Sequence, residues 1–384
     1  MTGIEVEPFE VPLDAGAVES LRARLRATRW PEAEAVDDWS QGVPLSYAQE
    51  LCRYWAEEYD FGFADRVNAF PGFRTTLAGP DGDGLGIHFL HVRSPEPDAF
   101  PLVMTHGWPG SVVEFLDVLG PLTDPRAHGG DPADAFHVVV PSLPGYGWSD
   151  RPARHGWGVP HIATAWHELM VGLGYERYGA QGGDWGAGVT TTMAIQAPPG
   201  LAGIHVNMAI ALPGPDDLAD LTPAEQQALA DIGEHDKWGT GYSKQQSTRP
   251  QTLGYGLTDS PAGQCAWIAE KFWAWTDCDG HPERALTKQQ MLDDISVYWF
   301  TATAASSARL YWESFASFDM SDVSLPSGVS VFPREIFRPS RRWCERRYTD
   351  LVWFNELPKG GHFAAFEQPA PFVDEVRGCF RGIR

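Results

Sequence analysis

An aspartate is flanked by small residues in the stretch Gly182-Gly-Asp-Trp-Gly186, directly after a strand-like run over residues 175–180. Small residues two positions before and two positions after a central residue are typical of a nucleophile elbow, a sharp turn between a strand and a helix. That elbow usually carries serine, and a lone aspartate in such a loop could also cap the following helix. We interpret Asp184 as a nucleophile.

An aspartate nucleophile restricts the kind of substrate. Aspartate has a reference pKa of about 3.9, so it is ionised at neutral pH and needs no base in order to attack. It is a weak nucleophile, and its target carbon must therefore carry a reactive leaving group. Attack on a saturated carbon gives an ester that water can cleave, whereas a serine would give a stable ether. The elbow therefore predicts epoxide opening or dehalogenation rather than ester hydrolysis.

Hydrolysis of such an ester needs a base and a group that orients the base. His362 lies in the loop Lys359-Gly-Gly-His after the last strand-like run, which fits the chain order nucleophile, acid, histidine. The acid should follow the preceding strand, where Glu335 stands. Asp350 is the alternative, but it begins the next strand rather than ending one. We expect Glu335 to hold the His362 imidazole in the useful tautomer and to stabilise its cation.

Two further groups are needed for the reaction. Water attack on the ester creates an oxyanion, and in such elbows backbone N–H groups stabilise it; the candidates are those of Trp185 and of Trp108, in the turn His106-Gly-Trp-Pro-Gly110. Epoxide opening also needs an acid, and a phenol with a pKa of about 10 is suited to that role. Spacing leaves four phenols open as candidates: Tyr242, Tyr255, Tyr298 and Tyr311.

The surrounding sequence alternates short apolar runs with glycine-rich loops and helix-length stretches. Runs over 100–105 and 136–140 are too short for helices and apolar nearly throughout, and a helical stretch over 162–173 follows them. Such runs are typical of strands buried on both faces of a parallel sheet. The same pattern resumes at 329–332 and 351–354. It predicts an α/β fold with a mostly parallel central sheet.

The remaining sequence divides the chain further. Residues 1–95 are expected to form an N-terminal segment with a helix over 18–29, a second helix over 47–59 and a strand over 86–92. Ser46 and Gln49 have the spacing of a capping box for the second helix. The aromatic, helix-rich section 207–322 lacks the strand pattern. We therefore predict three parts made of four segments, which are a clamp (1–95), a core (96–206 and 323–384) and an inserted helical cap (207–322).

Several motifs resemble those of the microsomal-type epoxide hydrolases, a family of the α/β-hydrolase superfamily that includes the insect juvenile-hormone enzymes. They are Thr28-Arg-Trp-Pro31, His106-Gly-Trp-Pro-Gly-Ser111, Gly182-Gly-Asp-Trp-Gly186, Leu257-Thr-Asp-Ser-Pro-Ala-Gly263, residues 298–311 and Gly360-Gly-His-Phe-Ala-Ala-Phe-Glu367. The resemblance implies an α/β-hydrolase fold and a reaction that needs no cofactor or metal. It implies Asp184 as the nucleophile and Glu335 and His362 as the charge pair. Among the four phenols it selects Tyr242 and Tyr311 as donors to the epoxide oxygen.

Composition excludes some partners. Among 384 residues, 29 Lys and Arg stand against 51 Asp and Glu, which gives a formal net charge of −22 and offers no basic stripe for nucleic acid or anionic lipid. No apolar stretch is long enough to cross a membrane. The acidic N-terminus does not resemble a secretory signal. The five scattered cysteines are typical of reduced thiols and give no support to a zinc site.

The resemblance also bears on location and setting. Mammalian members of the family carry an N-terminal membrane anchor, whereas this sequence starts directly in the N-terminal segment and looks more like the soluble bacterial members. Some of those serve secondary metabolism, including the pathways to enediyne antibiotics. We therefore expect a cytoplasmic enzyme. Exposed aromatic residues on the cap or clamp would suit a homodimer.

The leading hypothesis is an enzyme that converts an epoxide and water to a vicinal diol through an ester on Asp184. The aromatic cap favours a bulky aryl epoxide, because aromatic rings bury large areas and stack on one another. A haloalkane dehalogenase is an alternative, since Trp108 and Trp185 could bind a halide through their N–H groups. A ligand-binding protein without activity is another, although such proteins usually lose a member of the triad.

Overall fold

A nine-stranded sheet forms the centre of the structure, a computed structural model that describes residues 3–316 and 318–384. The strand order is β1-β2-β3-β5-β4-β6-β7-β8-β9. Strands β4 to β9 pair in parallel, and β1 to β3 add an antiparallel edge. The bounds are β1 (Glu7–Pro8), β2 (Gly72–Ala78), β3 (Gly84–Val92), β4 (Phe100–Thr105), β5 (Phe136–Pro141), β6 (Tyr178–Gly182), β7 (Leu201–Val206), β8 (Ser327–Val331) and β9 (Leu351–Glu356).

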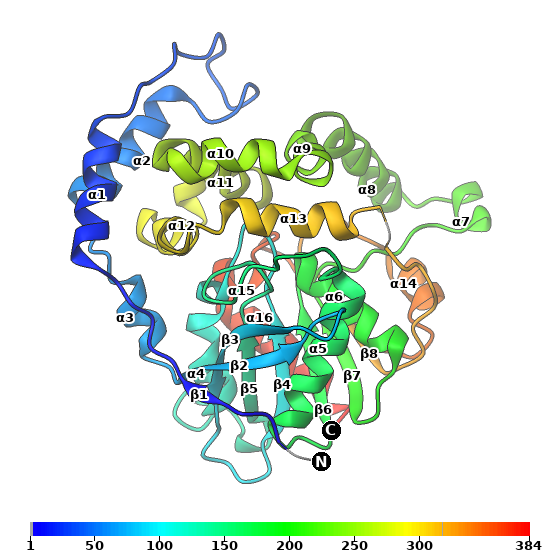
Figure 1. Ribbon diagram of the computed structural model, residues 1–384. Helices are drawn as coiled ribbons and strands as arrows, with labels where there is room; N and C mark the ends of the chain where they lie inside the picture. The colour runs from blue at the N-terminus through cyan, green and yellow to red at the C-terminus, as the bar shows by residue number, and fades with distance from the viewer. Residues whose placement is uncertain (1–2, 317) are drawn as a thin grey trace.

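The central strands are buried on both faces, as the continuous apolar runs predict. Helices α5 (Val159–Gly172) and α6 (Asp184–Gln196) pack together in front of the sheet in Figure 1, and α16 (Pro369–Arg381) packs with α4 (Leu116–Thr123). Every residue of β6 and β8 is buried. The predicted α/β fold with a mostly parallel sheet is confirmed.

Helices above the sheet occupy the section for which the sequence predicts the cap (Figure 1). They are α7 (Pro215–Ala219), α8 (Pro223–Glu234), α9 (Gly241–Thr248), α10 (Pro250–Asp259), α11 (Pro261–Trp275), α12 (Lys288–Thr301) and α13 (Ala304–Ser314), with a π-helical turn over His235–Gly239. They lie over the ends of β4 and β6, where the chain turns toward Trp108 and Asp184. This arrangement lets the cap contribute side chains to the elbow.

The N-terminal segment runs from the sheet edge to the cap. Its helices are α1 (Ala15–Arg26), α2 (Leu45–Glu57) and α3 (Phe63–Asn68), and they contact α11 and α12. The Trp55 indole donates to Ser296 Oγ at 3.1 Å, and the Tyr59 hydroxyl donates to Asp293 Oδ1 at 2.7 Å. Arg66 also pairs with the Asp293 carboxylate. The segment therefore holds α12 through buried polar contacts as well as apolar packing.

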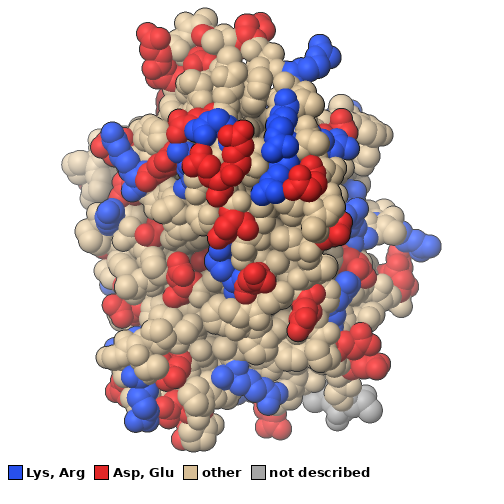
Figure 2. Space-filling model, turned by 90° about the vertical axis from the view of Figure 1, so that its left-hand side faces the viewer, with Lys and Arg blue, Asp and Glu red and all other residues tan. Residues whose placement is uncertain are grey.

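Charged residues are scattered over the face that carries these N-terminal helices. Figure 2 shows acidic and basic side chains interspersed over it. The net charge of −22 is thus not gathered into one acidic field on this face. Within the described part of the chain, no helix is both long and apolar enough to cross a bilayer.

Three local predictions were wrong in their details. The capping box is absent, because α2 begins at Leu45 and Ser46 therefore lies inside the helix. The first helix spans Ala15–Arg26 rather than 18–29, since the Asp14 side chain caps it by accepting from the Ala17 N–H at 2.9 Å. The strand expected over 175–180 lies at Tyr178–Gly182, where it pairs with β4 and β7.

The buried Tyr59 hydrogen bond gives a stability prediction. Tyr59→Phe leaves Asp293 without one donor, and we expect the free energy of unfolding to fall by about 1–3 kcal/mol. Urea unfolding followed by circular dichroism measures this. Tyr255→Phe makes the same change at a side chain that is 71% exposed, and should change the free energy by less than about 0.5 kcal/mol. Equal stability of the two variants would contradict the clamp contact.

Candidate active site

The turn at Asp184 depends on glycines packed against its neighbours. Asp184 has a φ of +49°, in the left-handed region, at the junction of β6 and α6. A Cβ on Gly182 would lie 2.1 Å from the Gly186 carbonyl oxygen, and a Cβ on Gly186 would lie 1.9 Å from the Thr105 carbonyl oxygen. A larger side chain at Gly186 would push the turn away from β4, and one at Gly182 would collide with the first turn of α6. The sequence pattern therefore produces the strained turn that an elbow requires.

His362 lies between two carboxyl groups. Its Nδ1 is 2.7 Å from Glu335 Oε1, and its Nε2 is 3.2 Å from Asp184 Oδ2. Glu335 follows β8 and His362 follows β9, so the parallel strands bring both to the edge of the sheet where Asp184 follows β6. Asp350 is exposed and lies at the start of β9, away from this edge. The structure thus brings Asp184, His362 and Glu335 into contact, whereas Asp350 lies away from them.

The charge of His362 follows from this arrangement. Burial by itself would lower the pKa of His362, but the negative charge of Glu335, with the contacts to Asp184, outweighs it and raises the pKa well above its usual value. Glu335 is in turn held by the Ile336 N–H, which donates to its Oε1 at 2.6 Å. We therefore expect an imidazolium at neutral pH while Asp184 is a free carboxylate.

One of the two expected oxyanion donors contacts Asp184 directly. The Trp108 backbone N–H donates to Asp184 Oδ1 at 2.8 Å. Gly107 permits this approach, because a Cβ there would lie 2.1 Å from the same carboxylate oxygen. Trp185 follows Asp184 in the first turn of α6, and its N–H as the second donor stays a prediction. Its indole packs edge-on against Tyr311, with ring centroids 4.8 Å apart.

The cap places Tyr242 and Tyr311 beside the elbow. Tyr242 comes from α9 and Tyr311 from α13, and their ring centroids are 5.7 Å apart. Trp108 stacks on Tyr242 at 5.1 Å. Burial is the main cause that raises the pKa of Tyr242, and the negative charge of Asp184 adds to it. For Tyr311, burial again comes first, followed by the charges of Tyr242 and Asp184. Both phenols therefore keep their protons at neutral pH and can donate them.

The other two candidate phenols are placed differently. The Tyr298 hydroxyl is buried and donates to the Gly110 carbonyl at 2.8 Å, so it supports the turn that carries Trp108. Tyr255 is 71% exposed on α10. The geometry therefore favours the pair that the family resemblance selects.

A buried lysine beside Tyr242 was missed by the sequence analysis. Lys271 of α11 is 2% exposed, and its Nζ lies 4.3 Å from the centre of the Tyr242 ring and 2.9 Å from Glu270 Oε1. A cation over the ring favours negative charge on the phenol oxygen. The local sequence could not reveal this contact, because a lysine in a helix is usually exposed to solvent. The contact also depends on how α9 and α11 lie in the tertiary structure.

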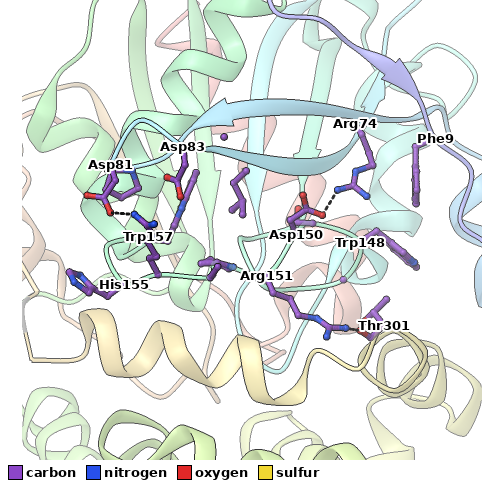
Figure 3. A pocket seen from close by; sticks show the side chains of 18 of the residues that line it. Phe9, Arg74, Asp81, Asp83, Trp148, Asp150, Arg151, His155, Trp157 and Thr301 are labelled. Carbon is purple, nitrogen blue, oxygen red and sulfur yellow. Dashed lines mark hydrogen bonds and ion pairs between the residues drawn. The ribbon is translucent and has the colours of Figure 1, made fainter.

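An open groove lies elsewhere on the molecule. It measures about 740 Å³ and runs between the β2–β3 hairpin and the loop 147–157, as Figure 3 shows. Ion pairs of Arg74 with Asp150 and of Arg154 with Asp81 lie along it. None of its lining residues belongs to the Asp184–His362–Glu335 group. The groove is therefore separate from the candidate active site.

Known proteins are similar to this chain in both sequence and fold. Residues 6–115 match the family model described as epoxide hydrolase N terminus, and residues 101–234 match that of the alpha/beta hydrolase fold. The chain is 55% identical to a Stigmatella aurantiaca protein whose name assigns it provisionally to the epoxide hydrolases, over 99% of this chain and 86% of that protein. It is 34% identical to epoxide hydrolase 1 of Oryctolagus cuniculus, over 97% and 88% of the two chains. The chain belongs to the epoxide hydrolase family.

Solved structures agree with the assignment of this chain to the epoxide hydrolase family. The juvenile hormone epoxide hydrolase of Bombyx mori superposes with a TM-score of 0.89 at 31% identity, and covers 100% of this chain and 96% of its own. The epoxide hydrolase of Aspergillus niger gives the same TM-score at 29% identity, with 100% and 98% coverage. The family resemblance inferred from the motifs is confirmed, and the protein is an enzyme that hydrolyses epoxides.

The contacts of His362 give a pH prediction. Glu335→Gln removes the anion that contributes most to raising the pKa of His362, and we expect that pKa to fall. Titration of the labelled imidazole by NMR, assigned with His362→Gln, measures it. In the wild type the raised pKa contributes stability that is present below about pH 6.5 and is lost as the pH rises through the folded value. An unchanged titration in Glu335→Gln would contradict the assigned pair.

Proposed function

We propose that this epoxide hydrolase converts a bulky, aryl-substituted epoxide to a vicinal diol through a covalent ester on Asp184. The observation that carries the proposal is the position of His362, whose ring nitrogens lie 3.2 Å from Asp184 Oδ2 and 2.7 Å from Glu335 Oε1. Asp184 thus has on one side an imidazolium that can become a base once the ester forms, and protonated phenols nearby. This combination provides the groups needed for both half-reactions, the formation of the ester and its hydrolysis.

The first half-reaction is ring opening. Trp108 holds Asp184 Oδ1, which leaves Oδ2 as the attacking atom. A C–O bond of the epoxide breaks as the bond from Oδ2 to carbon forms, and the electron pair passes to the epoxide oxygen. Tyr242 and Tyr311 donate to that oxygen and one of them gives it a proton. The products are a hydroxyalkyl ester on Asp184 and a phenolate.

The second half-reaction is hydrolysis. Ester formation removes the Asp184 charge, one of the two anions that raise the pKa of His362, so the imidazolium can pass its proton toward the phenolate and become a base. Water then attacks Asp184 Cγ and gives its proton to His362. The oxyanion accepts from the N–H groups of Trp108 and Trp185. Collapse releases the diol, whose alkoxide takes the proton from His362. The carboxylic acid left on Asp184 then gives its proton to His362, which restores the carboxylate and the imidazolium.

The aromatic surroundings support a bulky aryl substrate. The phenols are bordered by Trp108, Trp185 and Trp275, whose ring centroids lie 4.8–6.3 Å from neighbouring aromatic rings. Aromatic ligands gain from stacking on such walls. Trp238 and Trp312 of the cap are 71% and 55% exposed, which supports the proposed homodimer. A cytoplasmic location and a role in enediyne-type biosynthesis stay predictions that rest on the sequence and its resemblance.

A single turnover in ¹⁸O-water tests the covalent step. With enzyme in excess, we expect the first diol to carry no label, because its new oxygen comes from Asp184, and the label to appear in the peptide that contains Asp184. Mass spectrometry of the diol and of that peptide measures both. Asp184→Ala should form no ester and little diol. Label in the first diol would exclude the ester.

A substrate panel tests the substrate class. We expect diol formation from styrene-type oxides to exceed that from small aliphatic epoxides by about tenfold or more in kcat/KM, since stacking with the Trp-lined site adds transition-state binding. Chiral chromatography of the diols and an ion-selective measurement of halide release from haloalkanes complete the panel. Equal turnover of aryl and small alkyl epoxides would contradict the aryl preference, and halide release at a similar rate would favour dehalogenation.

A further inference from the structure

A second groove lies between the loop 151–157 and helix α13. It measures about 500 Å³, and it shares residues 151–155 and Trp157 with the groove of Figure 3. Its wall on α13 consists of Ser306, Arg309, Leu310, Trp312 and Glu313. The volume lies within the range of small-molecule sites, about 300–1,000 Å³. None of the described residues that line it is a candidate catalytic residue, so this groove is also separate from the active site.

Arginines outnumber carboxylates in this groove. Among the described residues that line it, Arg151, Arg154 and Arg309 face a single acidic side chain, Glu313. The excess stands out in a chain whose formal net charge is −22. Glu313 also has a structural role, because its Oε1 accepts from the Gly156 N–H at 2.9 Å and so holds the loop against α13. The groove therefore has a local excess of positive charge.

Two of these arginines have no anionic partner. Within residues 3–316 and 318–384, no Asp or Glu oxygen lies within the ion-pairing distance of 4.0 Å from Arg151 or Arg309. The Arg151 guanidinium donates to the Thr301 carbonyl, as Figure 3 shows. Arg309 donates to the Pro152 carbonyl at 3.5 Å. Each guanidinium has five N–H donors, so most of them stay available to a ligand.

The two arginines lie close enough for their positive charges to interact. Burial lowers the pKa of Arg309 and the charge of Arg151 lowers it further, whereas Glu313 opposes the change. An arginine keeps its proton at neutral pH, so deprotonation does not relieve this repulsion. Arg154 has a distant partner, with 3.8 Å between its guanidinium and Asp81 Oδ2. An anion among the three guanidinium groups would offset their repulsion and accept their N–H groups.

Apolar surface adjoins the charged part of the groove. Pro144 and Leu310 line it, and so does Trp312, whose side chain is 55% exposed. An exposed indole offers a face on which a flat ring can stack. An inorganic oxyanion would fill only part of a groove of this size. The remaining space suits an organic group beside the indole.

We propose that this groove binds a phosphate monoester with a flat organic group. Arg151, Arg154 and Arg309 donate to the phosphate oxygens, and Trp312 contacts the ring. Guanidinium groups suit phosphate because two parallel N–H donors can contact two of its oxygens at once. The inference concerns a site outside the epoxide reaction and does not rest on the ester mechanism.

Charge balance favours a phosphate over a carboxylate. Three arginines and one glutamate leave two positive charges on the wall of the groove. A phosphate monoester carries a charge of about −1.5 to −2 at neutral pH, so it balances both charges. A carboxylate would balance only one of them.

Calorimetric titration with phenyl phosphate tests the site. We expect the wild type to bind it, and Arg309→Met should raise the dissociation constant by about tenfold or more, because a charged hydrogen-bond donor is lost. Arg26→Met removes the same charge from an exposed position on α1 and should change the dissociation constant by less than about twofold. Trp312→Ala should weaken the binding of phenyl phosphate more than that of inorganic phosphate.

Two further variants control for folding and for location. Arg151→Met changes an exposed side chain and should also weaken binding, which decides the matter if circular dichroism shows that Arg309→Met does not fold. Asp184→Ala should bind phenyl phosphate as the wild type does, because Asp184 does not line this groove.

Three results would overturn the proposal. They are a wild type that does not bind phenyl phosphate, equal weakening by Arg26→Met and Arg309→Met, and displacement of phenyl phosphate by the diol of styrene oxide. The second result would show only the effect of net charge, and the third would place the ligand in the active site. A Trp312→Ala variant that binds phenyl phosphate as the wild type does would overturn the role of the indole. The proposed epoxide hydrolysis would stand in each case.

Discussion

The bridge that His362 makes between the buried Glu335 carboxyl group and the largely buried Asp184 carboxyl group is the constraint on which the site depends. Glu335 and Asp184 follow different strands, and the imidazole contacts both within 3.2 Å. Burying one of these charges without its partner would be costly, so each group is stable only where the others stand. The order β6-β7-β8-β9 meets this requirement, because parallel strands end at one edge and present their loops together.

The elbow imposes a second requirement on the core. Asp184 has a left-handed backbone conformation in a turn that Gly186 lets pack against β4 and in which Gly182 leaves room for the start of α6. That packing also sets the distance from Asp184 to the Trp108 N–H. Strain in the backbone and the hydrogen bond from the Trp108 N–H to Asp184 therefore have one origin, the close approach of the turns that follow β4 and β6.

The cap must be held as firmly as the core, because it carries the phenols. Tyr311 comes from α13 and Tyr242 from α9, and neither helix belongs to the sheet. The N-terminal segment fixes the neighbouring α12 through Tyr59 and Trp55. Lys271 reaches the Tyr242 ring from α11. The described part of the N-terminal segment thus holds α12 in place beside the helices that carry the two candidate phenols.

Local patterns in the sequence were sufficient for the fold class, the elbow and the candidate residues Glu335 and His362. Apolar runs and glycine spacing report local backbone geometry directly, and so they identified the strands and the turn. They were wrong at Ser46 and at the ends of the first helix, where a single cap decides the boundary by about 1 kcal/mol. Spacing also could not choose among four phenols, and the choice came from motif resemblance.

By itself the sequence determined which residues were available for chemistry and that Asp184 would lie in a sharp turn between a strand and a helix. Only the tertiary structure decided that Lys271 is buried beside Tyr242 and that a small cavity adjoins Asp184 and His362. The reason is physical. Burial, pKa and hydrogen-bond partners depend on contacts between residues far apart in the chain, and no local pattern encodes those contacts.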